Sequence, residues 1–425
     1  MTNWSLRVLG TETSLPKVGC ECASYPSERP VVLVFSEYYE PGYRAGGALR
    51  TVVNIVRQLG ERFDFRVVTR DRDKDDDRAY PGVTPGQWTR VGPAMVYYGS
   101  RASVRLSPLA QLVRHVQPDA IYLNSFFSPF ARRVLLLRRC GRIGALPVLL
   151  APRGELSSGA LSIKNAKKRA YMSIAAAACL HDGLLWQASS ELEEVEIREY
   201  MGEGTTVFVA PDLVDYTQGE LQTHTRPAKA PAHADILFLS RIAPKKNLLF
   251  CLEVLSQMRG SIHFTIAGPA DDQHYWERVR ARIGQMPAHI QIEYLGAVPP
   301  TIARGLVESA HFLFLPTLGE NFGHVIFEAL SRGVPPLISD LTPWRGLASA
   351  GAGWDLPLAS TDAWVSQLQA CVDMGQLEYD RLSHGAREAA SSWLRNNDLA
   401  AATALALDAA ARHGSGRRAG KPPCA

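Results

Sequence analysis

Two basic residues five positions apart, Arg241 and Lys246, could bind a diphosphate. Arg241 follows an apolar run at 236–240 that predicts a buried strand, and Lys246 opens a helical pattern over 246–258. A guanidinium can hold a phosphate through two hydrogen bonds, and an ammonium acts as a point charge. Because a strand-end arginine is more often only a surface residue, this pair needs a partner motif before it indicates a site.

Two glutamates, Glu320 and Glu328, flank the predicted start of a later helix. The run at 312–316 predicts a strand, a polar loop with glycine follows it, and the helix begins near residue 322. Glu320 precedes that helix and could reach hydroxyl groups, whereas Glu328 lies inside it and could face a cleft. The alternative is that both glutamates are solvated. The backbone N–H groups at the helix start predict an anion site, formed by Asn321, Phe322, Gly323 and His324.

Strands and helices alternate along the chain in two series, which predicts two doubly wound α/β domains. The first series has strand candidates at 31–39, 65–69, 120–124, 147–151, 184–188 and 207–210, with helices near 48–61, 129–140, 161–181 and 190–200. The second has strand candidates at 236–240, 262–267, 290–295, 312–316, 336–339 and 353–358, with helices near 246–258, 273–284, 300–309, 323–332, 361–374, 377–394 and 397–412. Two such Rossmann-like domains would face each other across a cleft at the carboxyl ends of the strands, where open α/β sheets bind ligands.

The expected domain organisation has five parts. They are a poorly ordered segment at 1–30, an N-terminal Rossmann-like domain at 31–214, a linker at 215–234, a C-terminal Rossmann-like domain at 235–412 that includes the terminal helices, and a disordered tail at 413–425.

The composition excludes several classes of protein. The chain has 425 residues, of which 46% are hydrophobic and 21% charged, as in ordinary globular proteins and unlike disordered or fibrous ones. No run reaches the ~18 apolar residues that a membrane-spanning helix needs. Seven scattered cysteines argue against a disulfide framework or a zinc site, so a cytoplasmic location is expected.

The basic residues concentrate in one segment, although the net charge of the whole chain is only +4. Residues 131–170 carry ten basic side chains and one acidic side chain, Glu155. Such a field attracts phosphates or anionic lipid, which predicts a peripheral position at the inner face of a membrane. The alternative is two solvated helix faces. Nucleic-acid binding is not expected, because the segment lacks interleaved aromatic residues and any nucleic-acid motif.

The charged pairs, taken together and in this order, resemble the retaining glycosyltransferases of family 4, which have the GT-B fold. Arg241 and Lys246 match an R-x4-K pattern, and Glu320 and Glu328 match an E-x7-E pattern. Further matches are Ile266-Ala-Gly268, Tyr294-Leu-Gly296, Thr342-Pro-Trp344 and the glycine loop from Tyr38 to Gly47. The stretch from Pro152 to Lys168 is similar to a subgroup found in cell-surface polysaccharide pathways. The resemblance covers about 31–400, and it implies that 31–214 is the acceptor-side domain and 235–412 the nucleotide-sugar-binding domain.

The resemblance implies a hexosyltransferase that moves a sugar from a nucleotide-diphosphate sugar to a glycan or lipid-linked acceptor. Arg241 and Lys246 would neutralise the leaving diphosphate, Glu320 would hold the sugar and Glu328 the ribose. Gly46 and Gly47 would let the backbone approach the phosphates, and the segments after Gly268 and Gly296 would read the base. A UDP-sugar is preferred as co-substrate, with no further cofactor. Arg153 would take the place of a histidine that many family members have.

Other readings remain open at this point. A phosphorylase or a nucleotide-sugar epimerase could use the same fold, and so could a non-catalytic scaffold that binds nucleotide sugars. Three signals are discounted. The D-x-D at Asp71–Asp73 is expected to be a solvated or acceptor-side loop and not a metal site. His181 is expected to be a favourable cation or a polar stop at a helix end. The glutamates at 191–196 are expected to form a solvated face.

Overall fold

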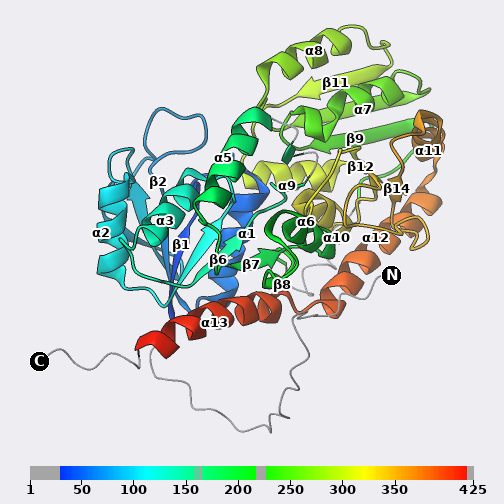
Figure 1. The fold of residues 1–425 in the computed structure, drawn as a ribbon. Helices are drawn as coiled ribbons and strands as arrows, with labels where there is room; N and C mark the ends of the chain where they lie inside the picture. The colour runs from blue at the N-terminus through cyan, green and yellow to red at the C-terminus, as the bar shows by residue number, and fades with distance from the viewer. Residues whose placement is uncertain (1–28, 158–159, 162–164, 217–225, 419–425) are drawn as a thin grey trace, which may run out of the picture. The chain divides into compact units, whose positions relative to one another are not determined.

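The computed structural model describes residues 29–157, 160–161, 165–216 and 226–418, which form two compact units (Figure 1). Among these residues, the first unit comprises 29–213 and 399–418, and the second comprises 214–398 apart from the gap at 217–225. Each unit is built on a mainly parallel sheet with helices on its faces, as the alternation of strands and helices predicts. The expected N-terminal segment lies almost entirely outside the described residues, as does the end of the expected tail.

The sheet of the first unit has eight strands, and all neighbours pair in parallel except β3 and β4. Their order is β3 (Trp88–Val91), β4 (Ala94–Gly99), β2 (Asp64–Arg70), β1 (Val31–Phe35), β5 (Ala120–Asn124), β6 (Val148–Ala151), β7 (Leu185–Ala188) and β8 (Val207–Val209). The sequence pattern does not predict the antiparallel hairpin of β3 and β4, because β3 is an edge strand with exposed side chains and no apolar run. The Gly92-Pro93 turn between the two strands is the local signal for it.

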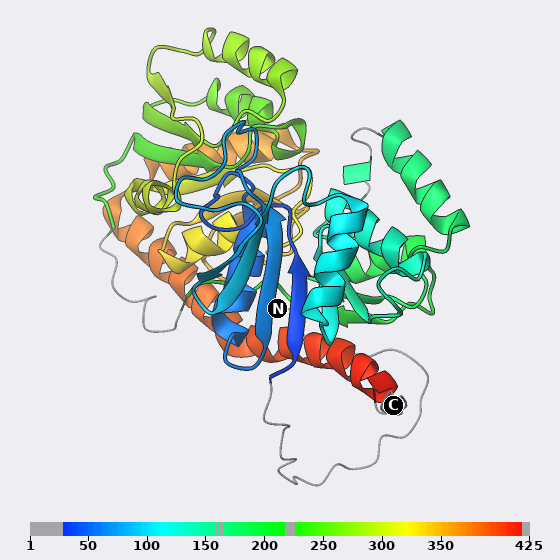
Figure 2. The ribbon, with the colours of Figure 1, turned by 90° about the vertical axis from the view of Figure 1, so that its left-hand side faces the viewer.

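Helices cover this sheet on both faces (Figures 1 and 2). They are α1 (Gly47–Leu59), α2 (Leu106–Val116), α3 (Pro129–Arg139), α5 (Asn165–Ala177), α6 (Glu191–Met201) and α13 (Leu399–Arg418). Helix α13 contacts α1, β5, β6 and β8, and its buried alanines, Ala402, Ala406 and Ala410, allow this close packing. This placement differs from the assignment to the second domain that the order along the chain predicts.

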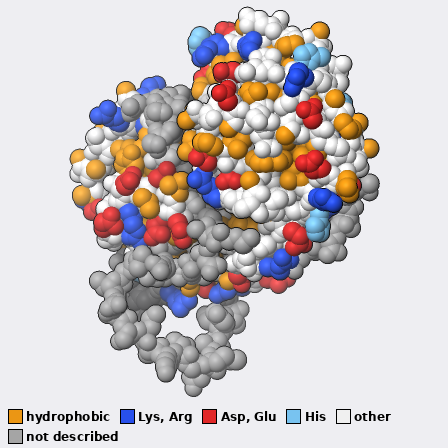
Figure 3. All heavy atoms as spheres, turned by 90° about the vertical axis from the view of Figure 1, so that its right-hand side faces the viewer, with side chains coloured by type: hydrophobic (Ala, Val, Ile, Leu, Met, Phe, Trp, Pro, Cys, Tyr) orange, Lys and Arg blue, Asp and Glu red, His pale blue; other side chains and the backbone are white. Residues whose placement is uncertain are grey.

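The sheet of the second unit has six strands, all parallel. Their order is β11 (Ile290–Tyr294), β10 (Ser261–Ala267), β9 (His233–Leu239), β12 (Phe312–Leu315), β13 (Pro336–Ser339) and β14 (Trp354–Leu356). The helices are α7 (Leu248–Leu255), α8 (Gln273–Ile283), α9 (Pro300–Ser309), α10 (His324–Ser331), α11 (Thr361–Asp373) and α12 (Gln376–Asn396). On the face shown in Figure 3, acidic, basic and hydrophobic side chains are interspersed. None of the helices in the described part of the chain combines the length and apolar content needed to cross a bilayer.

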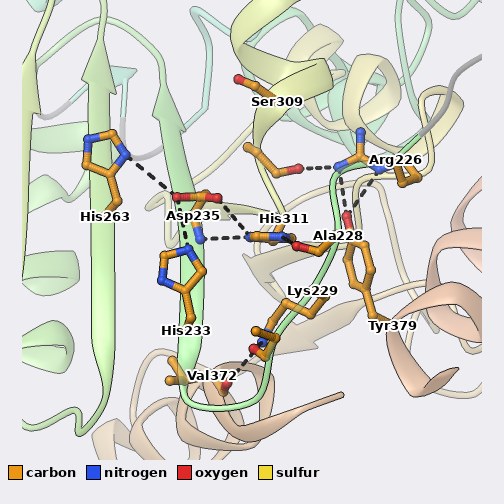
Figure 4. Close-up of polar contacts among 12 residues, drawn as sticks. Arg226, Ala228, Lys229, His233, Asp235, His263, Ser309, His311, Val372 and Tyr379 are labelled. Carbon is orange, nitrogen blue, oxygen red and sulfur yellow. Dashed lines mark hydrogen bonds and ion pairs between the residues drawn. The ribbon is translucent and has the colours of Figure 1, made fainter. Parts of the chain in front are cut away.

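Polar side chains hold the segment that leads into β9 against the second unit (Figure 4). The Arg226 guanidinium donates to the Tyr379 hydroxyl at 2.8 Å, and the buried Lys229 ammonium donates to two backbone carbonyls at the end of α11 at 2.9 Å each. His311 accepts from the Asp235 amide at 2.9 Å through Nδ1 and contacts a backbone carbonyl at 3.0 Å through Nε2. The last part of the expected linker therefore packs on the second unit, and residues 217–225 lie outside the described residues.

His181 is a partly buried residue of the first unit that packs among aromatic rings. Its ring stacks on Phe126 with the centroids 5.0 Å apart and lies 6.0 Å from the ring of Trp186. Burial lowers the pKa of His181 to about 4, and the nearby Asp182 carboxylate only partly opposes this. The Nε2 atom is buried without a hydrogen-bond partner in the structure. The lowered pKa disfavours the expected helix-end cation, and the alternative of a polar stop stays a prediction.

The stability of the first unit is expected to fall as the pH drops from about 6.5 towards 4. The folded pKa of His181 lies below its unfolded value, so its contribution is complete above pH ~6.5 and is lost during acidification. The loss is about 1–3 kcal/mol after allowance for the partial exposure of the ring. Urea unfolding at pH 7.5 and 5.0 measures it. His181→Phe should reduce the pH dependence, whereas His115→Gln, at an exposed position in α2, should leave it unchanged. An unaltered pH profile in His181→Phe would contradict this assignment.

Candidate functional site

The second sheet has its switch point between β9 and β12. The chain winds from β9 to β10 and β11 on one side, and from β12 to β13 and β14 on the other. In open parallel sheets, ligands bind beyond the carboxyl ends of the strands at this point. The loops that follow β9 and β12 are residues 240–247 and 316–323. They carry the R-x4-K pair and Glu320, so the topology brings together residues that lie about 75 positions apart in the sequence.

The Lys246 ammonium contacts the Glu320 carboxylate at this switch point. Their side chains are only 12% and 13% exposed. The backbone joins the two loops as well, because the Lys245 carbonyl accepts from the Leu318 amide at 2.8 Å and from the Thr317 hydroxyl at 3.1 Å. The structure therefore unites one member of each sequence motif in a partly enclosed ion pair, where charges interact more strongly than in open solvent.

Arg241 lies near the same strand ends but is more open to solvent. Its side chain is 48% exposed, and the guanidinium pairs with the Asp271 carboxylate at 3.0 Å. A β-bridge between Ile242 and Ala270 holds the segment after β9 beside the segment after β10. Arg241 can therefore turn towards an anion at modest cost, because an exposed ion pair contributes little to stability.

Gly268 and Gly296 lie side by side where β10 and β11 end. The Gly268 amide donates to the Gly296 carbonyl at 2.7 Å. Gly268 has φ +143°, and a Cβ at that position would collide with the Ser240 carbonyl oxygen behind β9. Only glycine allows the three strand ends to approach this closely. The two glycines thus flank the same edge of the sheet as Arg241, and their role in donor binding stays a prediction.

Helix α10 begins at His324, directly after Gly323, which has φ +80°. The Phe322 carbonyl accepts from the Trp344 indole at 2.6 Å, and both rings pack with Phe327 and Trp393. This aromatic cluster packs against the loop at the start of α10, where amides without intrahelical partners could bind an anion. Glu328 lies in the second turn and is partly buried.

In the first unit, the glycine loop after β1 is held by an aspartate. Gly46 adopts φ +71° and precedes α1, which begins at Gly47. The buried Asp73 carboxylate accepts from the amides of Tyr43 at 2.9 Å and Arg44 at 3.3 Å. The D-x-D aspartates are therefore structural: Asp73 supports the loop and the buried Asp71 pairs with its neighbour Arg72. The description of this stretch as a solvated loop is wrong at these two positions.

Arg153 is a buried cation with partners inside the first unit. Its side chain is 6% exposed and contacts the equally buried Asp212 carboxylate and the Tyr122 hydroxyl, while Nε donates to Asn124 Oδ1 at 2.9 Å. The next residue, Gly154, donates its amide to Glu193 at 2.6 Å. Glu193 is buried at the start of α6, which corrects the prediction that its helix presents only solvated glutamates. No local sequence motif predicts that Asp212 and Tyr122 contact Arg153, or that Glu193 contacts Gly154.

Several basic side chains of the segment 131–170 form hydrogen bonds inside the first unit. Arg138 donates to the Leu146 carbonyl at 3.1 Å, Arg139 to the Ala178 carbonyl at 2.9 Å and Lys168 to the Ala160 carbonyl at 2.5 Å. Lys164 lies outside the described residues. The remaining exposed cations are Arg132, Arg142, Lys167 and Arg169. Docking on an anionic membrane stays a prediction.

Across the described ranges, no three His, Cys, Asp or Glu side chains converge in a group that could hold a metal ion. The cations at and near the switch point are Lys246 and Arg241.

Comparison with known proteins gives the family of the second unit. Residues 222–388 match the family model described as "Glycosyl transferases group 1". Those residues form a group 1 glycosyltransferase domain. The matched range contains Arg241, Lys246, Glu320 and Glu328, so the resemblance based on these motifs is confirmed.

Two curated relatives are phosphatidyl-myo-inositol mannosyltransferases. That of Mycolicibacterium smegmatis is 29% identical over 175 residues, which cover 40% of this chain and 42% of the relative. That of Mycobacterium leprae is 29% identical over 141 residues, covering 32% of this chain and 36% of the relative. The chain thus matches less than half the length of these relatives.

Solved structures extend the likeness over both units. HepE of Anabaena, in complex with UDP and glucose, has a TM-score of 0.65 at 16% identity and covers 90% of this chain and 100% of its own. Sucrose-phosphate synthase from Thermosynechococcus elongatus has a TM-score of 0.66 at 16% identity, covering 92% of this chain and 100% of its own. The fold is GT-B, as predicted, with two α/β units built on parallel sheets.

Proposed function

We propose that this protein is a retaining hexosyltransferase in cell-surface polysaccharide biosynthesis. It would move a sugar from a nucleoside diphosphate sugar, with uridine preferred, to a glycan or lipid-linked acceptor. The observation that carries the proposal is the Lys246–Glu320 contact at the switch point of the matched domain, beside Arg241. Two similar proteins are phosphatidyl-myo-inositol mannosyltransferases, and HepE, which has a similar fold, was solved with UDP and glucose. Both likenesses support the proposal.

The chemistry follows from the charges at the strand ends. As the bond between the sugar C1 and the diphosphate oxygen breaks, its electron pair passes to the diphosphate. Lys246 and Arg241 stabilise that charge, which is electrostatic catalysis and needs no carboxylate nucleophile. The acceptor hydroxyl oxygen forms the new bond on the face that the diphosphate leaves, and its proton passes to a phosphate oxygen. Two permanent cations, in place of a metal ion, would carry the charge.

The ion pair gives Glu320 a second role in this scheme. In the structure it neutralises Lys246, and both groups are nearly enclosed. A diphosphate that reaches the ammonium would replace the carboxylate as its partner. Glu320 would then be released to accept hydrogen bonds from the hydroxyl groups of the transferred sugar. Glu328, one turn into α10, would accept from the ribose.

The two glutamates are expected to respond differently when neutralised. Glu328→Gln should weaken UDP binding roughly tenfold, because an ionised acceptor to the ribose becomes a neutral one. Glu320→Gln should retain or increase UDP affinity, because it releases the Lys246 ammonium, yet it should lower turnover. Titration calorimetry with UDP measures both affinities, and Glu277→Gln on the exposed face of α8 serves as the control. Equal loss of UDP affinity in both variants would refute the division of roles.

The proposed reaction is tested by mass spectrometry of products from a panel of nucleotide sugars and crude acceptor lipid. Transfer of a hexose with the donor's anomeric configuration supports the proposal. Release of a sugar phosphate, or donor turnover without an acceptor product, would favour a phosphorylase or an epimerase instead.

A further inference from the structure

Arg241, like Lys246, is paired with a carboxylate of its own at the strand ends of the second unit. The Arg241 guanidinium contacts Oδ2 of Asp271 through Nη1 at 3.0 Å. Within the described part of the chain, Asp271 is the one side chain that this guanidinium contacts by an ion pair or a hydrogen bond. The loop after β12 thus supplies the carboxylate for Lys246, and the loop after β10 supplies the one for Arg241.

The two members of the Arg241–Asp271 pair differ in how firmly they are held. The Asp271 side chain is 12% exposed, and the bridge between Ile242 and Ala270 joins the backbone next to it to the segment after β9. The Arg241 side chain is 48% exposed and ends in a group with five N–H donors. The carboxylate is therefore the anchored partner, and the guanidinium is the one that can move. Because a partly buried carboxylate is stabilised by a nearby cation, moving Arg241 away carries a cost.

A diphosphate at these strand ends would compete with Asp271 for Arg241. A guanidinium uses the same fork of donors for carboxylates and for phosphates. Two anions around one guanidinium lie within the ~8 Å Debye length of physiological salt, so their charges repel each other. A diphosphate that reaches Arg241 must therefore replace the carboxylate or bind against its charge. When the diphosphate leaves, the carboxylate regains the guanidinium.

We propose that Asp271 is a positioning residue that limits how tightly the nucleoside diphosphate product is held. By drawing Arg241 back, it lowers the affinity for the leaving diphosphate and speeds its release. Only the partner of the guanidinium changes, and no covalent bond forms or breaks. The effect on product release rests on the proposed function, whereas the competition between Asp271 and a diphosphate does not.

Calorimetry of the full chain with UDP and with inorganic pyrophosphate tests the competition. Asp271→Asn removes the charge and keeps the size and shape of the side chain. It should bind both ligands roughly two- to fivefold more tightly than the wild type, which is the factor that a partly exposed ion pair is worth. In turnover assays, inhibition by UDP should strengthen by the same factor. A merely structural role for Asp271 would weaken binding or leave it unchanged.

A double-variant cycle shows whether Asp271 acts through Arg241. In the Arg241→Ala background, Asp271→Asn should lose most of its effect on UDP affinity, because the group it competes for is gone. Glu277→Gln, on the exposed face of α8, is the matched control for the loss of one negative charge and should bind UDP like the wild type. Thermal unfolding reports whether each variant is intact. Asp271→Ala, which leaves no polar group behind, serves as the second variant.

Three results overturn the proposal. Equal or weaker binding of both ligands by the Asp271 variants removes the competition, and weaker binding makes Asp271 a support for Arg241 instead. An equal gain in affinity with and without Arg241 assigns the effect to the charge alone. Absence of binding of both ligands to the wild type is the third. If pyrophosphate binds the wild type and UDP does not, the proposed function fails, and the pyrophosphate titrations still decide the role of Asp271.

Discussion

Lys246→Ala is expected to lower kcat/KM for the donor roughly 10- to 150-fold while the chain stays folded. The loss of one charge-assisted contact to a diphosphate costs about 1.5–3 kcal/mol, which corresponds to that range. Lys246 should matter more than Arg241, because its side chain is 12% exposed and that of Arg241 is 48% exposed. Solvent screens the exposed charge more strongly. Turnover at subsaturating donor measures both variants.

Two control variants distinguish the loss of a diphosphate contact from a loss of folding. Arg280→Ala removes an exposed cation from the last turn of α8 and should leave kcat/KM unchanged. Lys246→Arg keeps the charge and should retain more activity than Lys246→Ala. Thermal unfolding of each variant reports whether the second unit remains intact. Wild-type turnover in both Lys246→Ala and Arg241→Ala would remove these residues from the site.

The sequence predicts the central strands and most helices because they are apolar in a regular pattern. Strand β12 is Phe-Leu-Phe-Leu, buried at every position, and α1 buries Val52, Val56 and Leu59 at helical spacing. Strand β3 lacks such a pattern because it is an edge strand with exposed side chains, so its hairpin with β4 is not predicted.

The charged motifs of the site are predictable as motifs but not as contacts. The spacing of Arg241 and Lys246 places them at one strand end, yet only the pairing of β9 with β12 brings Lys246 to Glu320. Asp73 and Glu193 show the opposite case. Both sit in acidic runs that are typical of solvated surface, and each is buried because it accepts from backbone amides far away in the sequence. Those amides carry no sequence signal.

Arg153→Met is expected to destabilise the first unit by about 3–5 kcal/mol. Arg153 and Asp212 are each 6% exposed, so the substitution leaves a buried carboxylate without its cation. It also removes the donors that Asn124 Oδ1 and the Tyr122 hydroxyl accept from. Urea unfolding of wild type and variant measures the difference. Arg57→Met, in an ion pair whose arginine is 46% exposed, is the matched control and should cost less than about 1 kcal/mol.

The double variant Arg153→Met with Asp212→Leu decides between a structural and a catalytic role for Arg153. Replacing both partners of a buried ion pair by apolar residues is often nearly neutral, so the double variant should recover most of the lost stability. If Arg153 only supports the loop before Gly154, transferase activity should return together with the fold. A stable but inactive double variant would instead mean that Arg153 touches the reacting groups, as the family resemblance implies. A single variant as stable as the wild type would contradict the burial argument itself, because an unpaired buried carboxylate cannot be without cost.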